Sequence, residues 1–344
     1  MNSVTDGEPT PTDHDGMAVV DQIGDVIALV RNHETSFGEG AKIMAAGTYN
    51  PRQYGGTTNL YFDIKEEKWI GSDSSLGGCI RPCAGGATPW GSWIAAEETL
   101  TYDEEAGGVD HGFLFDVLGF GGSDGVPIRK AGRFSHEAIA VDPRTGYVYE
   151  TEDARPAGFY KYVSPQVMGD GDWRDSFTAG TTLEDGGDLY VLAVKDMPSK
   201  YMYGWEEGFE GCCEAIPAGT TFDVEWVKID NPDPSGPLDS TGAGPDSDHP
   251  AILWQGEGAA LFTRLEGAWY GSGRIYFVAT DGGIAKEGQI WSYDPGSETI
   301  TMEYESPDRD IMDGPVRFLV AHANTEVHKS SPRLSHTADT IFYL

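Results

Sequence analysis

A short segment of the chain combines a cysteine with two adjacent acids. It reads CAGGATPWGSWIAAEE and runs from Cys83 to Glu98. Carboxylate oxygens suit hard cations such as Ca²⁺, whereas a thiolate is a soft ligand that suits a transition metal. A hairpin-like turn within the segment would bring both kinds of ligand to one place. The segment therefore indicates a metal site with mixed ligands, to which either Glu97 or Glu98 contributes.

Two further glutamates occur in matching sequence contexts. The segments RFSHEAIAVD (133–142) and RLEGAWYGSG (264–273) both place an arginine before a glutamate, and small residues follow. These glutamates are Glu137 and Glu266. A single such acid would more often cap a turn or pair with its own arginine. The matching contexts instead favour a shared cation site, with Glu97, Glu98 and Asp153 as further acids at strand ends.

Such a cluster of acids suits one kind of chemistry. Several carboxylates cannot all stay ionised in a dry channel unless cations lie between them. Sites with several metals and carboxylates suit phosphoryl transfer to water, because the metals clamp the phosphate and position or deprotonate the nucleophile. Arg264 could add a bidentate phosphate contact. The sequence has no GxSxG nucleophile motif, no P-loop and no dinucleotide fingerprint.

The elements that must position these residues repeat along the chain. Each unit has a turn glycine, an apolar or aromatic strand and a terminal acid, and then a second strand rich in aromatic and aliphatic residues. The first elements are residues 24–34, 91–98, 146–153 and 273–281, and the second elements are 57–63, 111–116, 158–162 and 288–294. The strand at 188–194 looks like a second element whose partner is degraded.

This repeat predicts an all-β chain folded as a β-propeller. The units begin near residues 17, 83, 133, 183 and 264, and a sixth would begin near Asp313, so we expect six blades. A β-sandwich also has regular short strands, but it does not explain the recurring acid at one strand end. In a propeller, equivalent positions converge on the central channel, and so would these carboxylates.

The composition restricts the partners and the surroundings of the protein. The chain has 56 acidic and 23 basic residues and a formal net charge of −33. A surface that binds nucleic acid needs the opposite charge, so the protein is not expected to bind DNA or RNA. No apolar run is long enough for a membrane span. The excess of surface carboxylate favours a halophilic protein, because high salt screens the self-repulsion, and the alternative is an ordinary acidic protein with cation sites.

Several motifs together resemble the PhoX-type alkaline phosphatases. They are CAGGATPWGSWIAAEE, GRFSHEAIAVDPRTGYVYETEDA (132–154) and RLEGAWY (264–270), and LVRNHE, YFVATDGG and GQIWSYDP fit the same pattern. The resemblance covers roughly residues 15–314. It implies a β-propeller that hydrolyses phosphomonoesters at a site with ferric iron and calcium. The metals in that family are held by one cysteine and several glutamates.

The resemblance also implies roles for individual residues. Cys83 matches the cysteine that binds iron, and Glu137 and Glu266 match glutamate ligands. Arg264 matches a phosphate-binding arginine that acts with these glutamates in catalysis. The remaining candidate ligands are Glu34, Glu97, Glu98, Glu152 and Asp153. We expect a monomer that acts on small phosphomonoesters, has neither a nucleic-acid nor a membrane partner, and works outside the cytoplasm.

Two departures from the family pattern keep other functions open. The segment GSDSSLGG (71–78) lacks the basic residue expected upstream of the cysteine, and Arg81 is the nearest base. The N-terminal residues show no twin-arginine signal and no other signal peptide. One alternative is another propeller hydrolase, such as a calcium-dependent lactonase or a phosphotriesterase-like enzyme. The other is a calcium-bound propeller that binds partners without catalysis.

We expect three parts along the chain. Residues 1–14 form a disordered N-terminal segment, 15–314 form the propeller, and 315–344 form a divergent tail. The tail has 2 acids and 3 bases, a balance of +1, whereas the other residues carry −34. This change in charge predicts an incomplete or irregular last blade, an open ring and an exposed edge strand.

Overall fold

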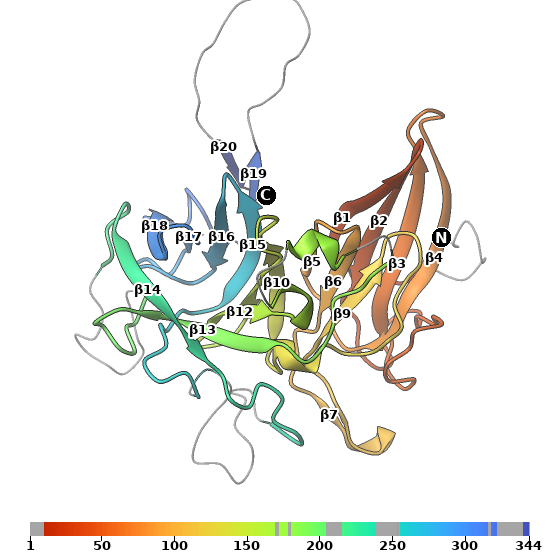
Figure 1. The fold of residues 1–344 in the computed structure, drawn as a ribbon, viewed down its shortest axis with the longest axis horizontal. Coiled ribbons are helices and arrows are strands. Elements are labelled where there is room, and N and C mark those ends of the chain that lie inside the picture. Colours follow the sequence, from red (N-terminus) through yellow and green to blue (C-terminus); the bar gives the residue numbers. More distant parts are fainter. Residues whose placement is uncertain are drawn as a thin grey trace, which may run out of the picture.

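The protein is all-β in a computed structural model, and its sheets are arranged radially as in a β-propeller (Figure 1). The structure describes residues 10–168, 172–177, 180–203, 215–238, 253, 255–315, 318–321 and 340–343. Among these residues, no helix is both long and apolar enough to cross a membrane. The predicted fold class is therefore confirmed.

The first two sheets are formed by the N-terminal third of the chain. The first sheet is an antiparallel meander of β1 (His14–Ile23), β2 (Val26–His33), β3 (Gly55–Asp63) and β4 (Lys68–Cys79). The second contains β5 (Gly86–Ala87), β6 (Ser92–Ala96) and β9 (Leu114–Leu118). A small ribbon of β7 (Tyr102–Asp103) and β8 (Val109–Asp110) lies in the connection between β6 and β9.

Two further sheets are joined edge to edge. The third sheet begins with β10 (His136–Val141), β11 (Val148–Glu152), β12 (Phe159–Val163) and β13 (Asp188–Val194). The fourth contains β15 (Leu265–Gly271), β16 (Arg274–Ala279), β17 (Gln289–Asp294) and β18 (Thr299–Glu305). Strand β14 (Thr221–Lys228) pairs with both β13 and β18 and so makes one sheet of nine strands.

The strand at 188–194 does not begin a blade of its own. It is β13, which pairs with β12 along residues 188–191 and completes the third sheet. The sequence expectation of a separate unit near residue 183 is therefore wrong, because β14 bridges to β18 rather than starting a new meander. The total of six blades stays a prediction.

The four repeated segments occupy equivalent places in the four sheets. Each first element is the second strand of its sheet, namely β2, β6, β11 and β16, and each second element is the adjacent strand β3, β9, β12 and β17. The repeat seen in the sequence is therefore confirmed as the second and third strands of each sheet, counted from its innermost strand.

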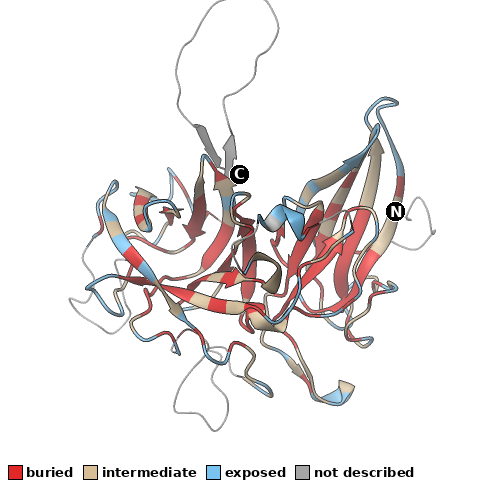
Figure 2. Cartoon of the chain, in the orientation of Figure 1, coloured by how far each residue is buried: buried red, intermediate tan, exposed pale blue. Residues whose placement is uncertain are grey.

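The core lies between successive sheets, where the strands are buried (Figure 2). Val30, Leu76 and Trp93 form one apolar cluster between the first and second sheets. Phe159 of the third sheet stacks on Phe277 of the fourth, with ring centroids 4.2 Å apart. Because each blade buries one face against the next, the packing fixes the order of the blades around the channel.

The innermost strands contact one another in the order β1, β5, β10 and β15, and β15 contacts β19 (Phe318–Ala321). Glycine makes this close approach possible. A Cβ on Gly16 would lie 1.7 Å from the carbonyl oxygen of Ala84, and one on Gly86 would lie 2.0 Å from that of Ile139. The bridge between Gly85 and Ala138 is parallel, so these inner strands run in the same direction along the channel.

The two ends of the chain are described only in part. β1 already begins at His14, and residues 1–9 lie outside the described residues. In the tail, β19 pairs with β20 (Thr340–Tyr343) (Figure 1). The remainder of the tail lies outside the described residues, so the incomplete last blade stays a prediction, as do the three predicted parts of the chain.

Candidate metal centre

Three innermost strands carry the same irregularity at the same level of the channel. In β1, β10 and β15, a β-bulge places two residues opposite one residue of the neighbouring strand. The bulged pairs are Asp15–Gly16, Glu137–Ala138 and Glu266–Gly267. A bulge bends the strand and redirects its side chains, and bulges are common beside active sites. Each acid is thus redirected where its strand enters the channel.

Cys83 occupies the equivalent place before β5, and we call Asp15, Cys83, Glu137 and Glu266 the ligand ring. The Cys83 Sγ donates to Oε1 of Glu137 across 3.4 Å. Possible ligand atoms of Asp15, Glu34 and Cys83 lie within 4.8 Å of one another, and the same holds for Cys83, Glu98 and Glu137. The ring therefore brings together residues that lie far apart in the sequence, one from each of four blades.

A second layer of residues comes from the ends of the second strands. It contains Glu34, Glu98, Asp153 and Thr280, which follow β2, β6, β11 and β16. Each of their backbone N–H groups donates a hydrogen bond to a backbone carbonyl oxygen. The residue that carries this carbonyl lies two positions before a ring residue in the sequence. The four acceptors are Asp13, Arg81, Ser135 and Arg264, at N···O distances of 2.8, 2.9, 3.0 and 2.9 Å. We call these four acceptors the rim, because they lie at one end of the ring.

Two rim residues are arginines held by the acids of the site. Arg264 bonds Asp153 through Nε and Nη2, both at 3.0 Å, and its Nη2 also pairs with Glu266. Arg81 bonds Glu34 through Nε at 3.0 Å and Nη2 at 2.7 Å, and its Nη2 reaches Glu98 at 2.5 Å. Arg264 therefore pairs with an acid of the ring and one of the second layer, and Arg81 pairs with two acids of the second layer.

Burial raises the pKa values of three acids of the site, and the charges of neighbouring acids raise them further. Burial, followed by the charges of Glu266 and Glu98, raises the pKa of Glu137 well above its usual value. Burial raises the pKa of Glu98 to about 8, with Asp153 and Glu34 adding to the effect and Arg81 opposing it. Burial and Asp153 raise the pKa of Glu266 to about 7. Without a cation, these groups would therefore retain protons near neutral pH.

The Cys83 thiol responds in the same way. Burial, and then the neighbouring Glu137 and Glu34, raise its pKa well above the usual value. A cation at the ring would reverse these preferences, because metal ligands bind in their deprotonated forms. The donor set, one sulfur and several carboxylates, fits a site that holds both a transition metal and a hard cation. The residues present therefore fit the metals that the sequence implied.

The structure separates Glu98 from its neighbour Glu97, which lies away from the ring. The Glu97 carboxylate accepts backbone N–H groups of Ile80 and Gly112, both at 2.8 Å, and of Phe113 at 3.2 Å. Successive side chains near a strand end point to opposite faces, so only one of two adjacent acids can face the channel. Glu98 is that acid.

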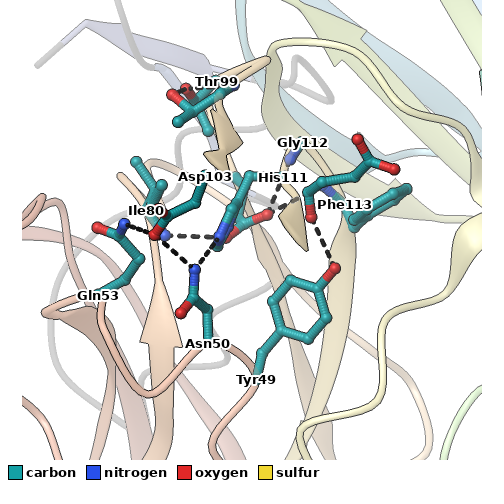
Figure 3. Close-up of polar contacts among 12 residues, drawn as sticks. Tyr49, Asn50, Gln53, Ile80, Thr99, Asp103, His111, Gly112 and Phe113 are labelled. Carbon is teal, nitrogen blue, oxygen red and sulfur yellow. Dashed lines mark hydrogen bonds and ion pairs between the residues drawn. The ribbon is translucent and has the colours of Figure 1, made fainter. Parts of the chain in front are cut away.

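Glu97 belongs to a buried polar network that holds the backbone before the ring cysteine and includes Asn50, Asp103 and His111, which Figure 3 shows. His111 donates from Nδ1 to Glu97 at 2.7 Å, because its Nε2 accepts from the Asn50 amide at 3.0 Å. Asn50 also donates to Asp103 at 3.0 Å. The network therefore ties the first sheet to the second and fixes the backbone at Ile80, three residues before Cys83.

Glu152 also lies away from the ring. Its carboxylate accepts the N–H of Gly158 and the hydroxyl of Tyr160, both at 2.8 Å. Burial raises its pKa to about 7 despite these bonds. Asp153, the next residue, is the one that bonds Arg264. The predicted residues that meet at the ring are Cys83, Glu34, Glu98, Glu137, Asp153, Arg264 and Glu266, whereas Glu97 and Glu152 do not.

Sequence reasoning missed Asp15. The signal was present, because the segments HDGM (14–17), HEAI (136–139) and LEGA (265–268) share an acid, a small residue and then an apolar or small residue. In each segment, the acid and the small residue form the bulge.

An apolar cavity of about 460 Å³ lies on the other side of the ring from the rim. It begins at Gly16, Ala84, Ala138 and Gly267, each of which directly follows a ring residue. Met17, Ile139 and Trp269 line it further along the inner strands. The described residues that line it include no charged side chain. The two ends of the channel thus differ, with the arginines at one end and an apolar cavity at the other.

Comparisons with known proteins identify similar proteins. The family model described as Alkaline phosphatase PhoX matches residues 63–330, which is more than half of the chain. Among solved structures, the chain is similar to that of Pseudomonas fluorescens PhoX in complex with vanadate, a transition state analogue. The TM-score is 0.52 and the sequence identity 17%, with 84% of this chain and 66% of that chain covered. This chain therefore spans just under two thirds of the length of that relative.

The likeness to that structure concerns the fold, because the identity is low. Both chains share the all-β propeller arrangement. No protein in the search of curated sequences matches this chain.

Proposed function

Because the chain belongs to the PhoX alkaline phosphatase family, as its motifs predicted, we propose that it hydrolyses phosphate monoesters at the ligand ring. The observation that carries this proposal is the convergence of a thiol and carboxylates from four blades beside two arginines. Such a site can bind metals and also attract a phosphate. The substrates are small molecules, because the proposed site lies within the channel of the propeller.

We assign the metals from the chemistry of the donors. Cys83 would bind iron, because its sulfur is a soft ligand, and Glu137 would share that ion, since it lies 3.4 Å from the sulfur. The carboxylates of Asp15, Glu34, Glu98 and Glu266 would bind calcium and complete the iron site. When bound, the metals would clamp the phosphate and lower the pKa of the attacking nucleophile.

Arg264 would hold the phosphate of the substrate. Its bonds to Asp153 and Glu266 use Nε and Nη2. Among the described residues, Nη1 has no hydrogen-bond partner, so one edge of the guanidinium is available for an oxyanion. Asp153 orients the group, and Glu266 places it at the ring. A negative phosphate would otherwise be repelled by the carboxylates, so a fixed positive charge is needed at this place.

The surroundings of the protein follow from its charge and family. We propose a halophilic, monomeric enzyme that works outside the cytoplasm, as the family resemblance implies. The excess of acids over bases would keep the protein hydrated and dispersed in concentrated salt. A nucleic acid would be repelled by the same charge.

Turnover of a chromogenic phosphomonoester, measured in molar KCl with iron and calcium present, tests the proposed function. We expect hydrolysis that a calcium chelator abolishes and that added calcium restores. Vanadate should inhibit it, because vanadate is the transition state analogue bound to the Pseudomonas fluorescens relative. Hydrolysis of a lactone or a phosphotriester instead would favour another propeller hydrolase. Binding of calcium without any hydrolysis would favour a non-catalytic binding module.

A further inference from the structure

Two rim arginines occupy equivalent positions in non-adjacent blades. Arg81 lies two residues before Cys83, and Arg264 lies two residues before Glu266. Their inner strands β5 and β15 are separated in the ring by β10. We propose that Arg81 is a second phosphate-binding residue that holds the substrate anion together with Arg264. This inference rests on the proposed function and adds a residue to it.

The backbone at both arginines has the same unusual conformation. The φ angle is 49° at Arg81 and 42° at Arg264. Both values lie in the left-handed region of backbone conformation, which residues other than glycine rarely adopt. Each carbonyl accepts the N–H of the residue that follows a second strand, Glu98 for Arg81 and Thr280 for Arg264. The two side chains thus leave equivalent backbone positions in the same way.

Both side chains are held in the same manner. Arg81 bonds Glu34 and Glu98, and Arg264 bonds Asp153 and Glu266. In each case the bonds use Nε and Nη2, and among the described residues Nη1 has no hydrogen-bond partner. Each arginine therefore keeps one N–H edge with which it can bind an oxyanion.

The acids link the two arginines into one network. Glu98, a partner of Arg81, lies near Asp153, a partner of Arg264, and the two carboxyl groups interact. The Arg81 side chain is 44% exposed and that of Arg264 is 33% exposed, so both remain accessible to an incoming ligand. A phosphate that enters from the rim would meet a positive group on two sides of the ring.

An arginine with two acid partners could instead serve only to fix those acids. In that case Arg81 would hold Glu34 and Glu98 in place for the metals and would not touch the substrate. The two roles predict different losses. A structural role predicts loss of metal, whereas a binding role predicts loss of phosphate affinity while the metal content is retained.

The test is the affinity of the metal-loaded protein for inorganic phosphate, measured by titration calorimetry together with the iron and calcium content. Arg81→Gln should weaken phosphate binding roughly 10- to 100-fold, because a charge-assisted hydrogen bond is lost. Arg81→Lys should lose less, because it keeps the charge. The matched control is Arg144→Gln, since Arg144 is 48% exposed and pairs with Asp142 beyond the far end of β10.

The control should bind phosphate like the wild type, and Arg264→Gln should weaken binding to a similar extent as Arg81→Gln. Unchanged phosphate affinity in Arg81→Gln, or a loss of metal from that variant, would overturn the inference about Arg81. Failure of the metal-loaded wild type to bind phosphate at all would instead contradict the proposed function.

Discussion

The thiol of Cys83 lies 3.4 Å from a carboxylate oxygen of Glu137, a residue of the next blade. Cys83 lies just before the inner strand β5, and Glu137 lies at the start of the inner strand β10. The backbone N–H of Gly85, also just before β5, donates to the Glu137 carbonyl at 2.8 Å. The contact between sulfur and carboxylate is therefore a consequence of how two blades pack. It joins a soft and a hard ligand at one point of the channel.

Glu97 and Glu98 should respond differently to the same substitution. Glu98→Gln should lower metal affinity and leave folding almost unchanged, because it removes a charge from a crowded site. Glu97→Gln should destabilise the fold by about 2–4 kcal/mol, because an amide nitrogen would face the N–H groups that the carboxylate now accepts.

Chemical denaturation together with metal analysis would check this pair. The prediction fails if Glu97→Gln unfolds like the wild type, or if Glu98→Gln is the less stable variant. Each residue is thus the matched control for the other. They are neighbours in the sequence, but their side chains lie on opposite faces of the strand end.

The sequence predicted much of the fold because its information is local. A turn glycine, an apolar strand and a terminal acid recur, and each repeat proved to be the second strand of a sheet. The choice between Glu97 and Glu98 could not be made in this way. It depends on which face of the strand end meets the channel, and that is set by the packing of β6 against the blades on either side.

Other features depend on tertiary structure to a greater degree. The pairing of β14 with both β13 and β18 corresponds to no recognisable sequence pattern. The sequence alone therefore predicts a separate unit for the strand at 188–194. Asp15 was missed for a different reason. Its segment has the same residue pattern as the other two bulged segments, but this short pattern does not by itself predict a β-bulge.

Asp15 should contribute to the metal site. Asp15→Asn should reduce the calcium content and turnover, because a neutral amide is a poorer ligand for Ca²⁺ than a carboxylate. Asp21→Asn, at the other end of β1, is the control and should behave like the wild type. Equal metal content and equal turnover in the two variants would remove Asp15 from the ring.

The metal-free protein should lose stability as the pH rises from about 4.5 to about 8. The pKa values of Glu98 and Glu266 are raised to about 8 and about 7 in the folded state, so in this range the folded protein holds more protons than the unfolded protein. The free energy of unfolding therefore falls with increasing pH. Bound calcium should reduce this dependence, because Glu98 and Glu266 are then ionised and paired, whereas buried acids away from the ring, such as Glu152, still contribute.

Thermal denaturation of the chelated protein across this pH range, in high salt to screen the general surface charge, would measure the effect. The variant Glu98→Gln should have a flatter profile than the wild type. A melting temperature that rises with pH in the metal-free wild type would contradict the raised pKa values of Glu98 and Glu266.

The stability of the whole protein should increase with salt. A formal net charge of −33 produces repulsion that KCl screens, so the melting temperature should rise between low and molar KCl. Sucrose at matched osmolality is the control, because it screens no charge. A protein that is equally stable in both salt conditions would not be a halophilic one.

We propose that Cys83 and the surrounding acids hold the metals with which the protein hydrolyses phosphomonoesters. The most direct test is the iron content of Cys83→Ala, measured beside turnover of a chromogenic phosphomonoester. Cys79→Ala is the matched control, because Cys79 is fully buried in the apolar cluster between the first and second sheets. We predict that Cys83→Ala loses iron and turnover while Cys79→Ala keeps both, and a Cys83→Ala variant with wild-type iron content would contradict the account.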